Sequence, residues 1–307
     1  MKILVTGGAG FIGSHIVALY TKAGHEVLVI DNLSSGSKKN VDQKAHFEQV
    51  DINDPSLHEI IGRFKPEIVN HQAAQIDVRK SVEDPSYDAQ VNIVGSLKVF
   101  EAARKAGSLK KILFASSGGA AYGDTDTIPT DESVPAKPIS PYGIAKVSVE
   151  MYLYYYNQIY NIPYIALRYS NVYGPRQNPH GEAGVVAICF QRLLSGKEFV
   201  INGDGEQTRD FVFVEDVARA SLLALDSEFI GEVNIATSVE TSIKSLVHQM
   251  ATSIEHKDEI PHGPAKTGEQ KRSCLDYSKA ENELGWKPEV DITTGIAKTA
   301  EYFKSNS

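Results

Sequence analysis

The sequence predicts an α/β fold, in which a doubly wound parallel sheet is joined to a smaller C-terminal α/β lobe. Short apolar runs alternate with segments of helical periodicity through the first half of the chain. Helices join these short strands, and such crossover connections are what parallel strands need. The 307 residues are 42% hydrophobic and 23% charged, which is typical of a soluble globular protein with a sizeable core.

The elements of the main sheet can be assigned in order along the chain. Strands are expected at 2–6, 26–30, in a run ending at Val50, and at 67–71, 110–117 and 164–170. Helices are expected at 13–23, 57–64, 87–106 and 141–160. This strand and helix order favours one continuous parallel sheet with helices on both faces.

The pattern changes after Tyr173, where GPRQNPHGEAG is rich in glycine, proline and polar residues. This loop is expected to open a second lobe, beginning with a helix at 185–194. The segments 211–225 and 232–238 are expected to return to the main sheet. The predicted domains are therefore residues 1–177 with 211–240, and residues 178–210 with 241–307.

Charge and cysteine content exclude several classes of protein. The 31 basic and 39 acidic residues give a net charge of −8, which argues against nucleic acid as the main partner. Cys189 and Cys274 have no metal-like spacing with each other or with the histidines, so neither a metal site nor a disulfide framework is expected. The sequence lacks a leader-like start and an apolar run of membrane length, so we expect a cytoplasmic protein that does not enter the membrane.

The first strand runs directly into GGAGFIG, which predicts a site for phosphate. Gly7, Gly10 and Gly13 let the backbone approach a pyrophosphate at the start of a helix, where amide groups and the helix dipole attract an anion. The second strand ends in Asp31, which suits a ribose and repels a 2′-phosphate, so a Rossmann-like fold that binds NAD is favoured. A glycine turn used only for helix packing is the alternative. Asp51 could touch the adenine or serve as a turn residue.

Candidate catalytic residues gather near the ends of the later strands. Tyr142 and Lys146 are four residues apart in SPYGIAKVSVE, so a helix would place them on one face. A nearby ammonium group favours the phenolate and lowers the pKa of a tyrosine, which makes it a usable base. Ser116 and Ser117 end the strand KILFASS, at the edge where parallel sheets bind ligands.

These motifs together resemble the extended short-chain dehydrogenase/reductases. The resemblance rests on GGAGFIGSH, DNLSSG, HQAA, SSGGAAYG, SPYGIAK, LRYSNVYGPRQ, GDGEQTRDFVFVEDV and LGWKP. It extends from Lys2 to about Phe303 and is greatest to the UDP-glucose 4-epimerase branch. It implies an isomerase that holds NAD as a resident cofactor and acts on a nucleotide sugar.

The resemblance also implies roles for individual residues. Tyr142 would be the base, Lys146 would lower its pKa and bind the nicotinamide ribose, and Ser117 would bond the reacting sugar oxygen. Loss of a proton and a hydride would give a transient 4-keto sugar, and hydride return to its other face would invert the centre.

The binding residues follow by the same resemblance. The implied cofactor site is Gly7, Gly10, Phe11, Ile12, Gly13, Asp31, Asn32, Ser35, Gly36, Asp51, Ile52, Gln72, Ala73, Ala74, Asn92, Tyr142, Lys146 and Tyr169. The implied substrate site is Ser117, Tyr142, Asn171, Val185, Val186, Asn202, Arg209, Lys266, Glu269 and Ser273. Arg209 would grip the UDP pyrophosphate, although a surface ion pair with Asp210 or Asp204 is its alternative.

Several positions bear on the substrate. Related dehydratases and decarboxylases have an acid near Ser117, whereas residues 118–121 here are Gly-Gly-Ala-Ala, so plain epimerisation is favoured. Ser273 aligns with a position that is small in enzymes accepting N-acetylhexosamines, so UDP-GlcNAc and UDP-GalNAc are expected alongside UDP-glucose and UDP-galactose. Lys266, Asn202 and Gln72 depart from the usual family residues, and for Gln72 the sequence offers no explanation.

The aromatic segment VEMYLYYYNQIY after Lys146 predicts a homodimer. With the helix at 91–106 it could form an intersubunit bundle, or it could pack beneath the second lobe. Two other functions stay open. One is a sister enzyme, such as a UDP-glucuronate 4-epimerase or a net dehydrogenase or reductase. The other is a non-catalytic nucleotide-binding relative, which usually loses the Tyr or the Lys.

Overall fold

The computed structural model describes residues 1–179, 184–266 and 270–306. Its centre is a seven-stranded sheet of order β10-β6-β5-β4-β1-β2-β3, in which each adjacent pair is parallel. The strands are β1 (Lys2–Thr6), β2 (Glu26–Ile30), β3 (His46–Glu48), β4 (Ile68–His71), β5 (Lys111–Ser117), β6 (Tyr164–Tyr169) and β10 (Gly231–Ile235). The strand order reverses direction between β1 and β4, which is where a doubly wound sheet binds ligands. The predicted fold class is confirmed.

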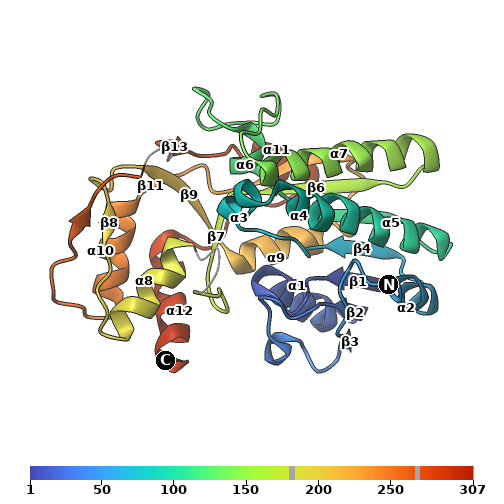
Figure 1. Cartoon of the computed structure of the whole chain (residues 1–307), viewed down its shortest axis with the longest axis horizontal. Helices are drawn as coiled ribbons and strands as arrows, with labels where there is room; N and C mark the ends of the chain where they lie inside the picture. The colour runs from blue at the N-terminus through green and yellow to red at the C-terminus, as the bar shows by residue number, and fades with distance from the viewer. Residues whose placement is uncertain (180–183, 267–269, 307) are drawn as a thin grey trace.

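Helices cover both faces of this sheet (Figure 1). One face packs against α2 (Leu57–Phe64), α5 (Ser96–Lys105) and α7 (Pro141–Tyr160). The other packs against α1 (Phe11–Lys22), α9 (Val214–Leu223) and α11 (Ser278–Leu284). The strands are apolar on both faces because both are buried, as expected for a parallel sheet. Among the described residues, no helix is long and apolar enough to cross a membrane.

The expected helix at 87–106 is divided by a change of helical pitch. The chain forms α3 (Val78–Glu83), α4 (Pro85–Ala89), a π-helical stretch η2 (Gln90–Gly95) and then α5. A π-helical stretch places an additional residue in the turn and redirects side chains, and it is frequent at functional sites. A short helix, α6 (Gly118–Tyr122), also follows β5, where no helix was expected.

The second part of the structure has its own core. Helices α8 (Val185–Leu194), α10 (Ile243–Ser253) and α12 (Ile292–Ser305) surround buried aromatic and aliphatic side chains. Beside them lies a small sheet of β7 (Asn171–Tyr173), β9 (Thr208–Phe213), β11 (Glu240–Ser242) and β13 (Arg272–Ser273). The strands β8 (Ile201–Asn202) and β12 (His262–Gly263) form a separate pair, and η1 (Lys38–Asn40) is a short turn in the first part.

The two segments expected to return to the main sheet behave differently. Residues 231–235 pair with β6 and form the edge of the main sheet as β10, which confirms that prediction. The segment from Phe211 begins in a strand, but its assignment to the main sheet was wrong, because β9 pairs with β7, β11 and β13 in the small sheet. The apolar run FVFV is buried in either sheet, so its composition could not distinguish them. The following helix, α9, packs on the main sheet, and Val212 of β9 contacts the same core.

Candidate active site

The phosphate cradle forms where β1 enters α1. Gly7 has φ +68°, and a Cβ there would lie 2.7 Å from the Ala73 amide nitrogen after β4. A Cβ on Gly13 would collide with the Gly7 carbonyl oxygen. Gly10 caps α1 without a side chain, and no acidic residue occupies the first turn. Phe11 and Ile12 begin the helix at this point, so the cradle offers backbone amides and a helix N-terminus to an anion.

The predicted adenosine residues form one group beside this cradle. Asp31 is buried and accepts hydrogen bonds from the Ala9 and Leu33 amides at 2.9 and 2.8 Å. Each carboxylate oxygen can accept a second bond. Asn32 donates to Asp51 at 2.7 Å, and both lie on the surface. The remaining members are Ser35, which is exposed, Gly36, which approaches Ala9, and Ile52, which is buried.

Gln72 has a structural role that the sequence did not reveal. Its side-chain nitrogen donates to Asn70 at 2.6 Å and to the Tyr169 hydroxyl at 3.3 Å. Burial raises the pKa of Tyr169, so that hydroxyl stays protonated. Ala73 and Ala74 follow the end of β4, and Ala73 lies beside Gly7. Gln72 therefore links the ends of β4 and β6 through polar contacts.

Asn92 lies in η2, with its side chain bonded to protein groups. Its nitrogen donates to the Gln75 carbonyl at 2.8 Å and to Asp88 at 2.9 Å, while its oxygen accepts from the Gln75 amide at 2.8 Å. Asn92 is also only 3% exposed. These contacts fix the loop after β4 rather than presenting an amide to solvent.

Tyr142 and Lys146 share one face of α7, as their spacing predicts. Lys146 Nζ is 5.6 Å from the centroid of the Tyr142 ring and donates to the Ala115 carbonyl at 2.8 Å. Lys146 is 4% exposed, and burial lowers its pKa to about 8 although Asp88 and Glu150 oppose the shift. Ser140 caps the N-terminus of α7 by accepting a hydrogen bond from the Gly143 amide. Burial thus brings the pKa of the lysine toward neutral pH beside the Tyr142 ring.

Ser116 and Ser117 have different environments at the end of β5. Ser116 is buried and donates to Glu150 at 2.6 Å. Successive side chains of a strand point to opposite faces, so Ser117 does not share this contact. It is partly exposed and precedes α6 without capping it. Of the two hydroxyls, Ser117 is the one open to a ligand.

Glu150 belongs to a buried polar network that the sequence reading missed. Arg168 donates to both carboxylate oxygens, at 3.0 and 2.6 Å, and also to the Tyr122 hydroxyl at 2.9 Å. Tyr122 in turn donates to Asn234 at 2.9 Å. The network therefore ties α7 to β6, α6 and β10. The spacing of Glu150, four residues after Lys146, was a signal that could have found it.

Two predicted substrate residues meet on the small sheet. Arg209 of β9 is paired in register with Ser273 of β13, and its Nη1 donates to the Thr208 carbonyl at 2.7 Å. Next to it, Asp210 is buried and accepts bonds from Thr237, Ser238 and Leu275. Asp210 thus ties three segments together and is no surface residue.

The other predicted substrate residues are more dispersed. Asn171 is exposed at the start of β7, while Val185 and Val186 begin α8 and the second of them is buried. Asn202 lies in β8, and Lys266 is exposed. Glu269 lies outside the described residues.

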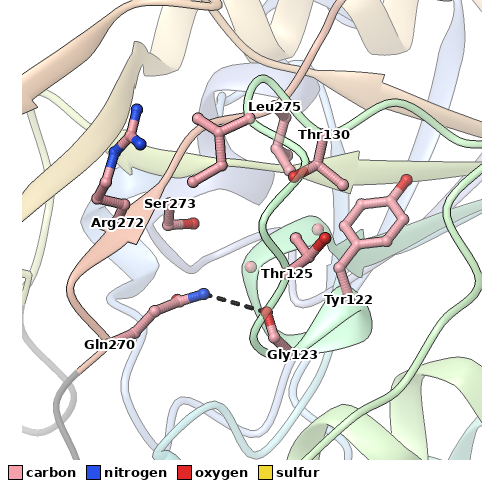
Figure 2. A pocket seen from close by; sticks show the side chains of 11 residues that line it. Tyr122, Gly123, Thr125, Thr130, Gln270, Arg272, Ser273 and Leu275 are labelled. Carbon is pink, nitrogen blue, oxygen red and sulfur yellow. Dashed lines mark hydrogen bonds between the residues drawn. The ribbon is translucent and has the colours of Figure 1, made fainter.

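A narrow cavity separates Ser273 from the glycine segment after Ser117 (Figure 2). A Cβ on Gly119 would lie 3.6 Å from Ser273 Oγ. Gln270 reaches across this cavity and donates to the Gly123 carbonyl at 3.1 Å. Arg272 also lines it, but its Nε donates to Glu240 at 2.9 Å. The cavity is therefore bounded on one side by the small residues Gly118, Gly119 and Ser273, and larger side chains such as Tyr122, Ile128 and Leu275 complete its wall.

Comparison with known proteins gives a consistent picture. A model of the NAD dependent epimerase/dehydratase family matches residues 3–236. The UDP-glucose 4-epimerase of Mycolicibacterium smegmatis is 45% identical over 313 residues, which cover 100% of both chains. The UDP-glucose 4-epimerase of Thermotoga maritima, solved with UDP-glucose, is 46% identical with a TM-score of 0.95, covering 100% of this chain and 99% of that one. The UDP-N-acetylglucosamine 4-epimerase of Methanobrevibacter ruminantium, in complex with UDP-N-acetylmuramic acid, is 35% identical with a TM-score of 0.94 and the same coverage.

The residues of the cradle fit the cofactor that this family uses. Gly7 and Gly13 leave the backbone open to a pyrophosphate, and Asp31 retains acceptor capacity for a ribose. The strand order places this cradle at the switch point of the sheet. The chain therefore belongs to the NAD dependent epimerase/dehydratase family, within the extended short-chain dehydrogenase/reductases, and uses NAD as its cofactor.

Proposed function

We propose that the protein is an isomerase that interconverts UDP-hexoses at C4, with Tyr142 as its base. The observation that carries this proposal is the pairing of Tyr142 with a buried Lys146 on α7, close to the end of β5. The full-length similarity to UDP-glucose 4-epimerases supports the same activity.

Each residue of the pair has a defined task in this reaction. Tyr142 accepts the proton of the sugar 4-hydroxyl and later returns it to the inverted centre. The Lys146 ammonium stabilises the tyrosine oxygen while it carries negative charge, and Ser117 donates a hydrogen bond to the reacting oxygen. NAD, held by the cradle of Gly7, Gly10 and Gly13, would supply reversible hydride transfer at C4.

The segment after Ser117 favours epimerisation over elimination. Gly118, Gly119, Ala120 and Ala121 have no titratable side chain. Loss of water from the sugar needs an acid and a base beside the reacting carbons. This segment therefore offers no side chain that could convert the ketone intermediate to a dehydrated product.

The nucleotide is assigned to the second part of the chain. We assign residues 178–210 and 241–307 to a lobe that binds the nucleotide sugar, and residues 1–177 with 211–240 to the NAD-binding domain. Arg209 would bind the diphosphate as a bidentate donor, with Lys266 as a second cation. Asn171, Val185 and Val186 would contact the sugar or nucleotide, while Asn202 would lie near the uracil and Glu269 near the ribose.

The cavity beside Ser273 has a volume of only about 10 Å³, so it supports the acceptance of N-acetylhexosamines only once Gln270 moves away from Gly123. Its walls at Gly118, Gly119 and Ser273 are small, and a similar protein is a UDP-N-acetylglucosamine 4-epimerase. An acetamido group entering here would displace Gln270 from Gly123. A glucuronate carboxylate is disfavoured because the guanidinium of Arg272 is already paired with Glu240.

A homodimer is the proposed assembly, formed through α5 and α7. On α7, Met151, Tyr154 and Ile159 are 68%, 57% and 59% exposed. Such a run of apolar side chains marks a contact surface. Sedimentation of the wild type and of Tyr154→Glu tests the dimer, since the variant should sediment as a monomer.

The free, buried thiols of Cys189 and Cys274 are compatible with the cytoplasmic location expected from the sequence.

One experiment tests the activity directly. The protein is purified without added NAD, its bound cofactor is measured, and UDP-galactose, UDP-GalNAc and UDP-glucuronate are each assayed for the 4-epimer. We expect bound NAD and epimerisation of the first two substrates. Epimerisation of UDP-glucuronate alone, or net oxidation with release of reduced cofactor, would replace this proposal with a sister activity.

A further inference from the structure

Asp88 is a buried carboxylate outside the predicted site. It lies in α4, which packs against α7, and only 1% of it is exposed. Its Oδ1 accepts hydrogen bonds from Gln75 and Asn92, both at 2.9 Å. Its Oδ2 is buried without a hydrogen-bond partner among the described residues. Burying a half-satisfied carboxylate costs free energy, so a nearby positive charge is needed to offset it.

Lys146 is the cation that offsets this charge. It is buried on α7. Burial raises the pKa of Asp88 above its usual range, and the hydrogen bond from Gln75 and the charge of Lys146 oppose that rise. Conversely, Asp88 is the first of the groups that raise the pKa of Lys146, ahead of Glu150. No direct ion pair joins the two side chains among the described residues, so the attraction acts through the buried contact between α4 and α7, where solvent screens charge weakly.

The other groups that face Lys146 cannot replace Asp88. Glu150, one turn later on α7, is already paired with Arg168 by two hydrogen bonds and raises the pKa of Lys146 less than Asp88 does. His71 of β4 is buried and neutral, because burial and Lys146 lower its pKa to about 3. Tyr142 is the residue whose phenolate Lys146 stabilises in the proposed reaction, so it is not a fixed charge. Of the two carboxylates that raise the pKa of Lys146, Asp88 is thus the one without an ion pair among the described residues.

We propose that Asp88 is a positioning residue whose fixed negative charge keeps Lys146 protonated, so that Lys146 can support the Tyr142 phenolate. This rests on the proposed function for the role of the pair in turnover, but the charge coupling itself does not. The π-helical stretch η2 contributes by bringing Asn92 onto Asp88 Oδ1, which orients the carboxylate.

Asp88→Asn removes the negative charge of the side chain and keeps its shape. Because Oδ1 takes both hydrogen bonds, an amide oxygen can keep them, while the amide nitrogen occupies the place of Oδ2. The matched control is Asp84→Asn, at the exposed N-cap of the same helix, where Asn caps as well as Asp. Asp88→Glu restores the charge and serves as the rescue.

The first readout is the pH profile of kcat/KM in the NAD-loaded enzyme. Loss of the Lys146 proton ends activity at high pH and so sets the alkaline limb of the profile. Asp88→Asn should shift the midpoint of this limb to lower pH by about one unit. Asp84→Asn should leave it in place, and Asp88→Glu should return it toward the wild type. An unchanged limb in Asp88→Asn overturns the proposal.

The second readout does not require epimerase activity. Near neutral pH, Asp88→Asn should lower the melting temperature when Lys146 is present, and should raise it in a Lys146→Met background, where the carboxylate has lost its cation. If Asp88→Asn alone does not fold, the double variant should still fold. Equal changes in both backgrounds would overturn the coupling, whatever the enzyme is found to catalyse.

Discussion

Lys146 Nζ lies 5.6 Å from the centre of the Tyr142 ring and donates to the carbonyl oxygen of Ala115, the residue before the two serines that end β5. One hydrogen bond therefore links the helix that carries the pair to the strand that carries Ser117. The lysine is buried, so its charge acts on its neighbours with little screening by solvent. This relationship underlies the proposed chemistry.

The cradle predicts that Gly13→Ala loses the cofactor. The added Cβ would meet the Gly7 carbonyl, so the turn must shift and its amides no longer converge on a pyrophosphate. Purified Gly13→Ala should carry little bound NAD. Gly62→Ala on α2 is the control, because open space surrounds that position, and it should retain NAD with stability raised by about 1 kcal/mol or less. Full NAD content in Gly13→Ala would contradict the cradle.

His71 predicts a loss of stability in acid. Burial lowers its pKa from 6.5 to about 3, and its ring lies between the hydroxyls of Thr6 and Ser96. Between these values the unfolded chain binds a proton and the folded chain does not. Stability should therefore fall as pH drops from 6.5 toward 3, by up to about 1.4 kcal/mol per pH unit. The free energy of unfolding, measured in urea across this pH range, should change less steeply with pH for His71→Gln than for the wild type. The same pH dependence in both proteins would contradict this account.

The buried pair of Glu150 and Arg168 predicts strongly non-additive substitutions. Removing one partner leaves the other charge buried, so Glu150→Leu or Arg168→Met should each cost about 3 to 5 kcal/mol in the free energy of unfolding. The double variant should cost much less than the sum of the two. Denaturant unfolding of the four proteins provides the measurement. Additive losses would mean that the pair is not energetically coupled.

Ser273 predicts a change of substrate preference. A tyrosine at this position would fill the cavity beside Gly119, so Ser273→Tyr should reduce turnover of UDP-GalNAc by about tenfold or more relative to UDP-galactose. Ser245→Tyr, at an exposed position of α10, should change neither substrate. Equal losses for both substrates in Ser273→Tyr would remove this cavity from the specificity argument.

The sequence predicted the main sheet well because its strands and helices have clear apolar periods. Helices α2, α7 and α8 have the expected bounds, and β10 returns to the sheet edge. The strand from Phe211 was assigned to the wrong sheet, since periodicity reports burial and not the partner strand. Similarly, η2 interrupts the helix expected at 87–106, because a change of pitch leaves no simple pattern in the sequence.

For the candidate site, local motifs were informative and long-range contacts were not. The four-residue spacing placed Tyr142 and Lys146 on one face of α7, and the glycines formed the turn at β1. Asp88, Gln72 and Arg168 act through partners that are distant in the chain, so their environments emerged only from the structure. The type of a charged residue does not show in the sequence whether its side chain is buried or exposed.

Turnover by Tyr142→Phe tests the central claim most directly. The variant keeps the ring beside Lys146 and removes only the hydroxyl, so it should retain NAD at the wild-type level and lose 4-epimerisation of UDP-galactose by a factor of about 10² to 10⁴. Fully active Tyr142→Phe with bound NAD would show that another group takes the proton, and would contradict the proposed mechanism.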